Sequence, residues 1–222
     1  AASIFETKES DGYLLSKCFN VMGVVYRHMG MYELALDQTK KAIDLSAQTE
    51  GTNHPGHAFQ LANLATLHAI LGQYSEAENL FFTVRDMFER FFGKEHPYYA
   101  QILTSISGLH QEMGRYESAE KLRLEAVRLT EKTLGNDNPE YALVLSNMSS
   151  LYLLTGNYSE AEFYAVKARE IFAKISGEES PDYALAARNL ANIYSNTKQY
   201  EKALENFEIV ESIHEELNKE GE

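Results

Sequence analysis

A spacing of 42 residues runs through this 222-residue chain and limits it to architectures built from repeated units. All four prolines follow the spacing, at Pro55, Pro97, Pro139 and Pro181. Eight of the 13 glycines follow it in two series, Gly30, Gly72, Gly114 and Gly156, and Gly51, Gly93, Gly135 and Gly177. One tyrosine and one alanine series, which start at Tyr32 and Ala35, recur five times each.

Each period predicts two helices. In residues 56–97, Leu61, Leu64 and Ala65 have helical spacing, and Gly72 then ends the first helix. A second apolar stripe runs over residues 74–91, and a glycine and a proline mark the next boundary. Small residues recur in both helices of every unit, which predicts a close approach where larger side chains would overpack.

These features resemble the tetratricopeptide repeat, in the 42-residue variety of kinesin light chains and many bacterial regulatory proteins. The resemblance is carried by HPYYAQIL, LANLATLHAILGQYSEAE and SNMSSLYLLTGNYSEAE, and it extends over residues 13–219. It implies an all-α fold, a right-handed superhelical solenoid of about five antiparallel helix pairs. We expect one solenoid over residues 1–222, with units at 13–54, 55–96, 97–138, 139–180 and 181–222.

The two outermost units depart from the pattern. Lys198 replaces the turn glycine in the fifth unit, and Tyr13 replaces the proline in the first. Residues 1–8 align with the end of a second helix, so residues 1–12 are expected to be the tail of a preceding helix followed by a linker. This alignment predicts that the chain is a fragment of a longer array or part of a larger multidomain protein, although the charged C-terminal stretch EELNKEGE is also compatible with a natural cap. The resemblance implies an attached domain such as the CHAT-type domains of bacterial members.

Composition excludes several classes of partner. The formal net charge is −13, which argues against binding to nucleic acid or to an anionic membrane. One cysteine, Cys18, excludes an internal disulfide, and it is expected to be a buried small hydrophobe. Without a signal peptide or a long apolar run, a cytoplasmic location is predicted.

The resemblance implies that the first helix of each unit lines a concave groove that binds peptides. The groove residues singled out as a binding site are Asn20, Arg27, Phe59, Asn63, Thr66, Asn147, Ser150, Arg188, Asn189 and Asn192.

Asparagines recur at one groove position, as Asn63, Asn147 and Asn189. A carboxamide can pair with both polar groups of a peptide backbone, and asparagines at this position bind cargo peptides in kinesin light chains. The other interpretation is that they only form hydrogen bonds between neighbouring helices. Val21 and Ser105 interrupt the series, which puts a continuous ladder of contacts in doubt.

The groove is expected to differ in charge from the rest of the chain. It contains three basic residues, Lys17, Arg27 and Arg188, and one acidic residue, Glu112. We therefore expect a protein or peptide partner with some acidic residues. The basic residues do not form the three-unit clamp of chaperone-binding relatives.

No motif for catalysis, a cofactor or a metal is found, so the chain is not expected to be an enzyme. His54 and His57 are three residues apart, but without an evident third ligand a hydrated linker is the preferred interpretation. His68 and His110 occupy a position held by tyrosine in other units and are expected to pack between helices.

The predicted function is a protein-interaction scaffold that binds an extended peptide or a partner domain in its groove. Two alternatives remain open: self-association through the end repeats, for example around Ile4 and Phe5, or sensing of a short signalling peptide. Both a monomer and a homodimer are compatible with the sequence.

Overall fold

The computed structural model describes the backbone of residues 2–220 and the side chains of residues 12–219. Within residues 2–220 it is a succession of helices without strands. They are α1 (Ala2–His28), α2 (Tyr32–Thr49), α3 (Pro55–Ile70), α4 (Tyr74–Phe92), α5 (Pro97–Glu112), α6 (Tyr116–Leu134), α7 (Pro139–Leu154), α8 (Tyr158–Ser176), α9 (Pro181–Asn196) and α10 (Tyr200–Glu220). The predicted all-α class is confirmed. None of these helices is long and apolar enough to span a membrane.

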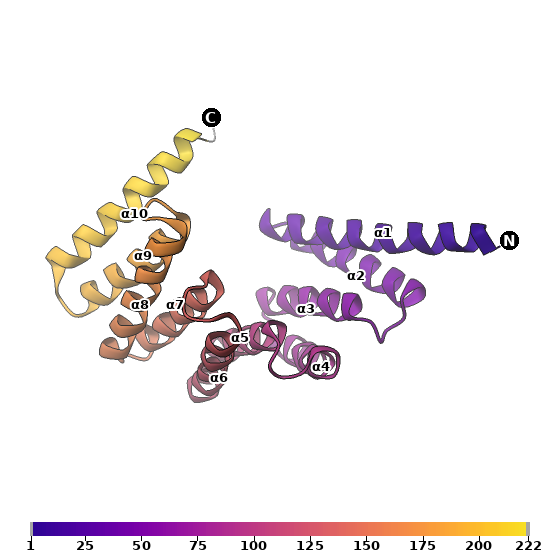
Figure 1. The fold of residues 1–222 in the computed structure, drawn as a ribbon, viewed down its shortest axis with the longest axis horizontal. Coiled ribbons are helices and arrows are strands. Elements are labelled where there is room, and N and C mark those ends of the chain that lie inside the picture. The colour runs from indigo at the N-terminus through magenta and orange to yellow at the C-terminus, as the bar shows by residue number, and fades with distance from the viewer. Residues whose placement is uncertain (1, 221–222) are drawn as a thin grey trace. The chain divides into compact units, whose positions relative to one another are not determined.

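The chain divides into two compact units, Ala1–Met113 and Gly114–Glu222. In unit 1, α1 pairs with α2 and α3 with α4, and each second helix packs on the following first helix, α2 on α3 and α4 on α5 (Figure 1). In unit 2, α6 packs on α7, α7 pairs with α8, α8 packs on α9, and α9 pairs with α10. That all five repeats form a single solenoid stays a prediction.

Local signals set the ends of the helices. Pro55, Pro97, Pro139 and Pro181 each occupy the first turn of a helix, where the missing N–H costs no hydrogen bond. The residue before each proline caps the helix with its side chain: Nδ1 of His54, for example, accepts a hydrogen bond from the amide of Gly56. The linker histidines His54 and His96 are therefore helix caps.

The expectation of a tail and a linker over residues 1–12 is wrong for the described residues. Helix α1 runs without interruption from Ala2 to His28. The physical reason is that Glu9 and Tyr13 stand where other units have the helix-ending glycine and the helix-starting proline. The side chains of Ile4 and Phe5, considered for self-association, lie outside the described side chains.

The turn between the two helices of a pair requires a left-handed backbone. Gly72 adopts φ = +73° there, and Lys198 adopts φ = +61° at the same place in the last pair. A side chain in this conformation is strained, whereas glycine is not. Replacing Lys198 with glycine should therefore raise the free energy of unfolding by about 1 kcal/mol. Urea unfolding followed by circular dichroism measures it, and an unchanged or lower midpoint would show that the turn carries no such strain.

The small residues at the predicted close approach are fully buried. In unit 2, Ser149 of α7 and Ala161 of α8 are both 0% exposed. In unit 1, a Cβ added to Gly23 would lie 2.5 Å from the side-chain oxygen of Thr39. The first and second helices of these pairs therefore approach too closely for larger side chains.

A recurrent polar contact joins three of the second helices, α4, α6 and α8, to the next first helix. Tyr152 and Tyr194 donate their hydroxyls to Glu120 and Glu162, and His110 Nε2 lies 2.9 Å from Glu78 Oε1 at the same position. Burial, reinforced by the carboxylate, raises the pKa of Tyr194 to about 12. The prediction that His110 packs between helices is confirmed. His68 instead contacts Gln73, because Leu36 replaces the glutamate in α2.

Candidate functional site

The candidate site is a hollow of about 430 Å³ in unit 1. Its wall is formed by the first helices α1, α3 and α5, and α4 contributes to its floor. The lining residues are Asn20, Phe59, Ala62, Asn63, Thr66, Phe81, Phe88, Gln101, Ile102 and Ser105. The volume lies within the range of ligand-binding pockets. Four of the residues singled out from the sequence, Asn20, Phe59, Asn63 and Thr66, are brought together here.

Two carboxamides stand side by side in this hollow. Nδ2 of Asn63 on α3 donates to Oδ1 of Asn20 on α1, at 2.8 Å. Hydrogen bonding between neighbouring helices was the second of the two interpretations of the recurrent asparagines, and the structure shows such a bond here. Both residues nevertheless also line the hollow. The bond leaves Oδ1 of Asn63 as an acceptor and Nδ2 of Asn20 as a donor, neither with another hydrogen bond among the described residues. A hydrogen bond to the neighbouring helix and contact with a peptide are thus compatible roles for Asn63.

Aromatic side chains form the apolar part of the hollow. The ring of Phe59 lies 5.0 Å from that of Phe88 and 4.8 Å from that of Tyr98, between ring centres. Phe88 is buried, whereas Phe59 is half-buried and keeps part of its ring open to the hollow. Edge-to-face and tilted contacts of this kind hold aromatic rings in fixed orientations. The hollow therefore combines a rigid apolar surface with two carboxamides.

The structure places the equivalent asparagine of unit 2 differently. Asn189 is buried, and its Nδ2 donates to the hydroxyl and the backbone carbonyl of Ser146 on α7, at 2.9 and 3.2 Å. Asn63 and Asn189 thus repeat one contact, since each bonds to the residue 43 positions earlier. For Asn189 the structure favours the interhelical role.

The other residues singled out in unit 2 lie on α7 and α9. Ser150 is half-buried, and its hydroxyl donates to Ser146 of its own helix. The side chains of Asn147 and Asn192 are also half-buried, and Arg188 is exposed. A buried arginine, Arg123 of α6, donates to the backbone carbonyl of Asn147, and burial lowers its pKa to about 10. A peptide-binding role for these residues stays a prediction.

Arg27 is separate from the hollow. Its guanidinium lies 3.2 Å from Nε2 of His28, and it is not one of the lining residues. The lining residues missed from the sequence are Phe81 and Phe88 of the floor and Ile102 of α5. The helical stripe of residues 74–91 identified the two phenylalanines only as core. The large aromatic Phe59 at a groove position was the available signal for an apolar hollow at this place.

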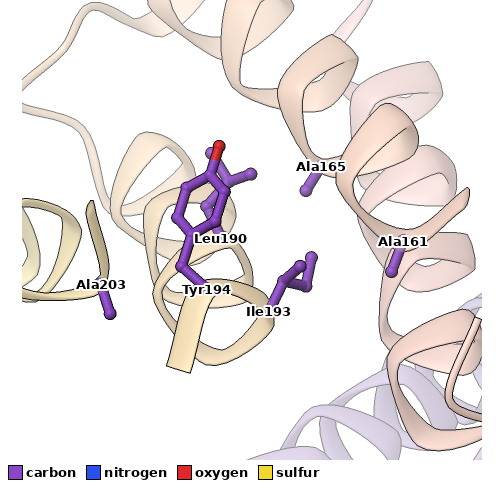
Figure 2. Close-up of a cluster of buried hydrophobic side chains, with 6 residues drawn as sticks. All are labelled: Ala161, Ala165, Leu190, Ile193, Tyr194 and Ala203. Carbon is purple, nitrogen blue, oxygen red and sulfur yellow. The ribbon is translucent and has the colours of Figure 1, made fainter. Parts of the chain in front are cut away.

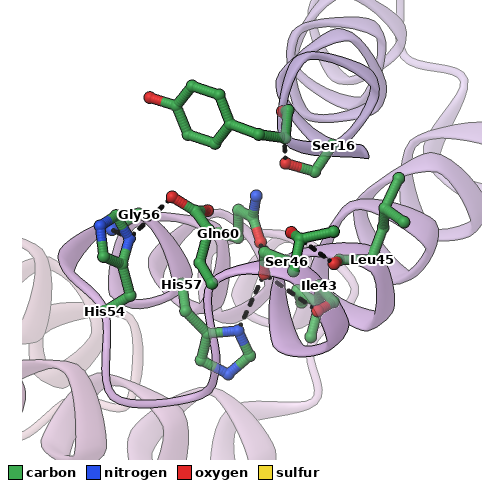
Figure 3. A network of polar contacts seen from close by, with 11 residues as sticks. Ser16, Ile43, Leu45, Ser46, His54, Gly56, His57 and Gln60 are labelled. Carbon is green, nitrogen blue, oxygen red and sulfur yellow. Dashed lines mark hydrogen bonds and ion pairs between the residues drawn. The ribbon is translucent and has the colours of Figure 1, made fainter. Parts of the chain in front are cut away.

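The interpretation of His57 as part of a hydrated linker is wrong. His57 is in the first turn of α3, is buried, and has its Nδ1 3.0 Å from the hydroxyl of Ser46 on α2 (Figure 3). The hydroxyl of Ser46 also donates to Oε1 of Gln60. Burial lowers the pKa of His57, partly offset by Glu50. Within the described part of the chain, no group of three histidine, cysteine or carboxylate side chains is placed to hold a metal ion.

Comparison with family models identifies tetratricopeptide repeats over most of the chain. One model of this repeat matches residues 15–90, 59–122 and 98–174, and a second matches residues 189–210. No curated protein sequence matches the chain significantly.

Solved structures with similar folds include three informative examples. BtubC (BKLC) from P. vanneervenii has a TM-score of 0.76 at 18% identity, over 93% of this chain and 82% of its own. A putative kinesin light chain repeat protein of P. anserina has a TM-score of 0.73 at 22% identity, over 94% and 98%. A Rap protein complexed with Competence and Sporulation Factor has a TM-score of 0.80 at 20% identity, over 94% of this chain and 56% of its own.

Proposed function

Because the chain belongs to the tetratricopeptide repeat family, we propose that it is a protein-interaction module that binds an extended peptide segment in the hollow of unit 1. The observation that carries this proposal is the Asn20–Asn63 pair beside the ring of Phe59. Support also comes from the similar Rap protein, whose structure is a complex with Competence and Sporulation Factor.

The carboxamide pair suits an extended backbone. Such a segment presents an N–H and a C=O in alternation, and the pair offers one acceptor, Oδ1 of Asn63, and one donor, Nδ2 of Asn20. These contacts hold a peptide without reading its side chains. Phe59 and Ile102 supply the apolar surface on which one peptide side chain is selected.

A preference for acidic residues is the finer part of the proposal. None of the residues that line the hollow is charged. The support comes from Lys17 and Arg27, which lie on α1, as Asn20 does. Lys17 is exposed, with its Nζ 4.0 Å from the centre of the Tyr13 ring, so a carboxylate can reach it from solvent. Acidic residues are therefore expected to flank the segment that fills the hollow.

The test begins with the selection of peptides that bind the protein from a random linear library. The affinities of these peptides are then measured for two variants, one with the hollow filled by a larger side chain and one with the hollow left open. Ser105 lines the hollow on α5, and its hydroxyl bonds only to Gln101 of the same helix among the described residues. Ser105→Trp should fill the hollow and weaken the selected peptides at least tenfold, about 1.4 kcal/mol. Ser105→Ala, which keeps the space, should bind them as the wild type does. Fluorescence anisotropy gives both affinities.

Two results would contradict the proposal. One is a selection that yields no binding peptide, and the other is equal affinity for the wild type and the tryptophan variant. Replacing the three recurrent asparagines Asn63, Asn147 and Asn189 together would be a less specific test, because Asn189 is buried and bonded to Ser146. Asn63→Ala alone removes one carboxamide of the hollow and leaves unit 2 unchanged.

A further inference from the structure

A second, smaller hollow lies within unit 2, where α6 and α8 begin and α7 ends. Its volume is about 190 Å³. This is below the usual range of ligand-binding pockets, so the hollow has room for a single side chain. The lining residues that matter here are Tyr116, Glu117 and Glu120 of α6, Tyr152 of α7, and Asn157, which precedes α8. We refer to it as the Tyr152 hollow.

The Tyr152 hollow combines an aromatic ring with carboxylates and contains no cation of its own. The hydroxyl of Tyr152 donates to Oε1 of Glu120, at 2.6 Å. Burial raises the pKa of Tyr152, and the carboxylates of Glu120 and Glu160 raise it further, so the hydroxyl stays protonated. None of the lining residues is basic. Neither Glu117 nor Glu120 forms an ion pair within the part of the chain that the structure describes.

The next repeat shows how a cation fits the same place. There the hydroxyl of Tyr194 donates to Glu162, and the tyrosine belongs to a buried cluster (Figure 2). Nζ of Lys202 lies over the ring of Tyr194, 5.0 Å from its centre, which is within the range of a cation–π contact. The same Nζ donates to Oε1 of Gln199, at 2.9 Å. A lysine of the chain itself therefore occupies this position in the last repeat.

A step of 42 residues transfers this arrangement to the Tyr152 hollow. Tyr152 corresponds to Tyr194, and Asn157 corresponds to Gln199. The two amide side chains are held alike, because the amide nitrogen of each donates to the hydroxyl of the threonine two residues earlier. In Gln199 the amide oxygen accepts from the lysine, whereas Oδ1 of Asn157 has no hydrogen bond among the described residues. The acceptor for an ammonium group is thus in place and unused.

The lysine is the member that this repeat lacks. Glu160 stands at the position of Lys202, is exposed, and has no proton to donate. The ring of Tyr152 is left half-buried. A second difference adds negative charge, since Glu117 stands at the position of Ser159. The Tyr152 hollow therefore retains the contacts of a lysine site and gains carboxylates, without a lysine to fill it.

We propose that the Tyr152 hollow binds a lysine side chain of a partner protein. The ammonium group lies over the ring of Tyr152 and donates to Oδ1 of Asn157, as Lys202 does at its own tyrosine and glutamine. Glu117 and Glu120 balance its charge, which they can do at short range in this partly desolvated place. This proposal concerns unit 2 and is independent of peptide binding in the hollow of unit 1.

The chemistry of the Tyr152 hollow selects against other side chains. An acidic side chain is repelled by Glu117 and Glu120. An apolar side chain would cover these carboxylates and the amide oxygen of Asn157 without offering them a hydrogen bond, which costs free energy. A compact ammonium group on a flexible stem matches the small volume better than the planar guanidinium of arginine does.

The test is a titration of the whole chain with a model compound, Nα-acetyl-lysine N-methylamide, followed by nuclear magnetic resonance. One side chain binds weakly, so a dissociation constant in the millimolar range is expected. The amide signals of Thr155 and Asn157 should shift and saturate, because these residues line the Tyr152 hollow. The norleucine counterpart has the same stem without the ammonium group and should leave these signals unchanged.

A pair of charge-matched variants locates the binding. Glu160→Lys should place a lysine of the chain in the Tyr152 hollow, as Lys202 is placed in the next repeat, and weaken the lysine compound by about tenfold or more. Glu170→Lys makes the same change of charge at an exposed position farther along α8 and should bind the compound as the wild type does. Matching circular dichroism spectra establish that both variants are folded.

Four results would overturn the proposal. The first is a lysine compound that does not shift the signals of Thr155 and Asn157, and the second is a norleucine compound that shifts them equally. The third is an unchanged affinity in Glu160→Lys. The fourth is an equal loss of affinity in Glu160→Lys and Glu170→Lys, which would show a general attraction of cations to the acidic chain.

Discussion

Replacing Phe88 with alanine is expected to lower the free energy of unfolding by about 3–5 kcal/mol, the usual range for a buried phenylalanine. Phe88 is buried in α4 and contacts the rings of Phe59, Phe92 and Tyr98. Alanine would leave a cavity beside three aromatic rings that also contact one another through Tyr98. Because a repeat is stabilised mainly by its neighbours, the loss should fall on unit 1. Urea unfolding measures the total, and amide hydrogen exchange locates it.

Phe163→Ala is the control for this prediction. Phe163 is also a phenylalanine of a second helix, but it is exposed on α8. Its replacement should change the free energy of unfolding by no more than about 0.5 kcal/mol. Equal losses for the two variants would mean that the aromatic cluster does not support unit 1. Phe88→Ala should also weaken peptides selected on the hollow, since Phe88 forms part of its floor.

The second large effect is expected from Ala161→Leu in unit 2, which should cost about 1–3 kcal/mol, and more if the helices cannot separate. Ala161 is 0% exposed in α8, where Ser149 of α7 is equally buried. Its Cβ also belongs to the cluster with Leu190 and Ile193 of α9 (Figure 2). Leucine adds three carbons to the side chain, and these would strain the contacts of α8 with α7 and with α9 at the same time. Thermal unfolding followed by circular dichroism measures the loss.

The control for Ala161→Leu lies on the same helix. Ser159 is exposed, and Ser159→Leu adds the same side chain without meeting a neighbouring helix. Its melting temperature should stay close to that of the wild type. If Ala161→Leu also left the melting temperature unchanged, the repeat alanines would not mark a close contact between helices.

The helices were predictable because the signals that end them are local. Glycines with positive φ and prolines in the first turn act through the backbone of their own residues, so their 42-residue spacing predicts where helices start and stop. The same reasoning accounts for the failure at the N-terminus. Where Glu9 and Tyr13 replace these signals, α1 continues without a break.

The binding site was only half predictable. The period places Asn63 and Asn189 at the same position, and the structure confirms that each bonds to the preceding first helix. The period cannot tell how open each one is, because burial depends on the partner side chain and on its neighbours. Asn63 meets the partly exposed Asn20 above an aromatic floor, whereas Asn189 meets the buried Ser146.

The sequence by itself determined the repeat, the class of fold and the faces of each helix, because these depend on spacing along one chain. The tertiary structure decided which of those faces are covered. Cys18 was expected to be buried, yet it is exposed, and so are Val25 and Phe207, whose equivalents in the other units are buried. Burial is a property of neighbouring helices in space: within residues 2–220, α1 packs mainly on α2 and α10 packs on α9, whereas helices between them, such as α3 and α8, have neighbours on two sides.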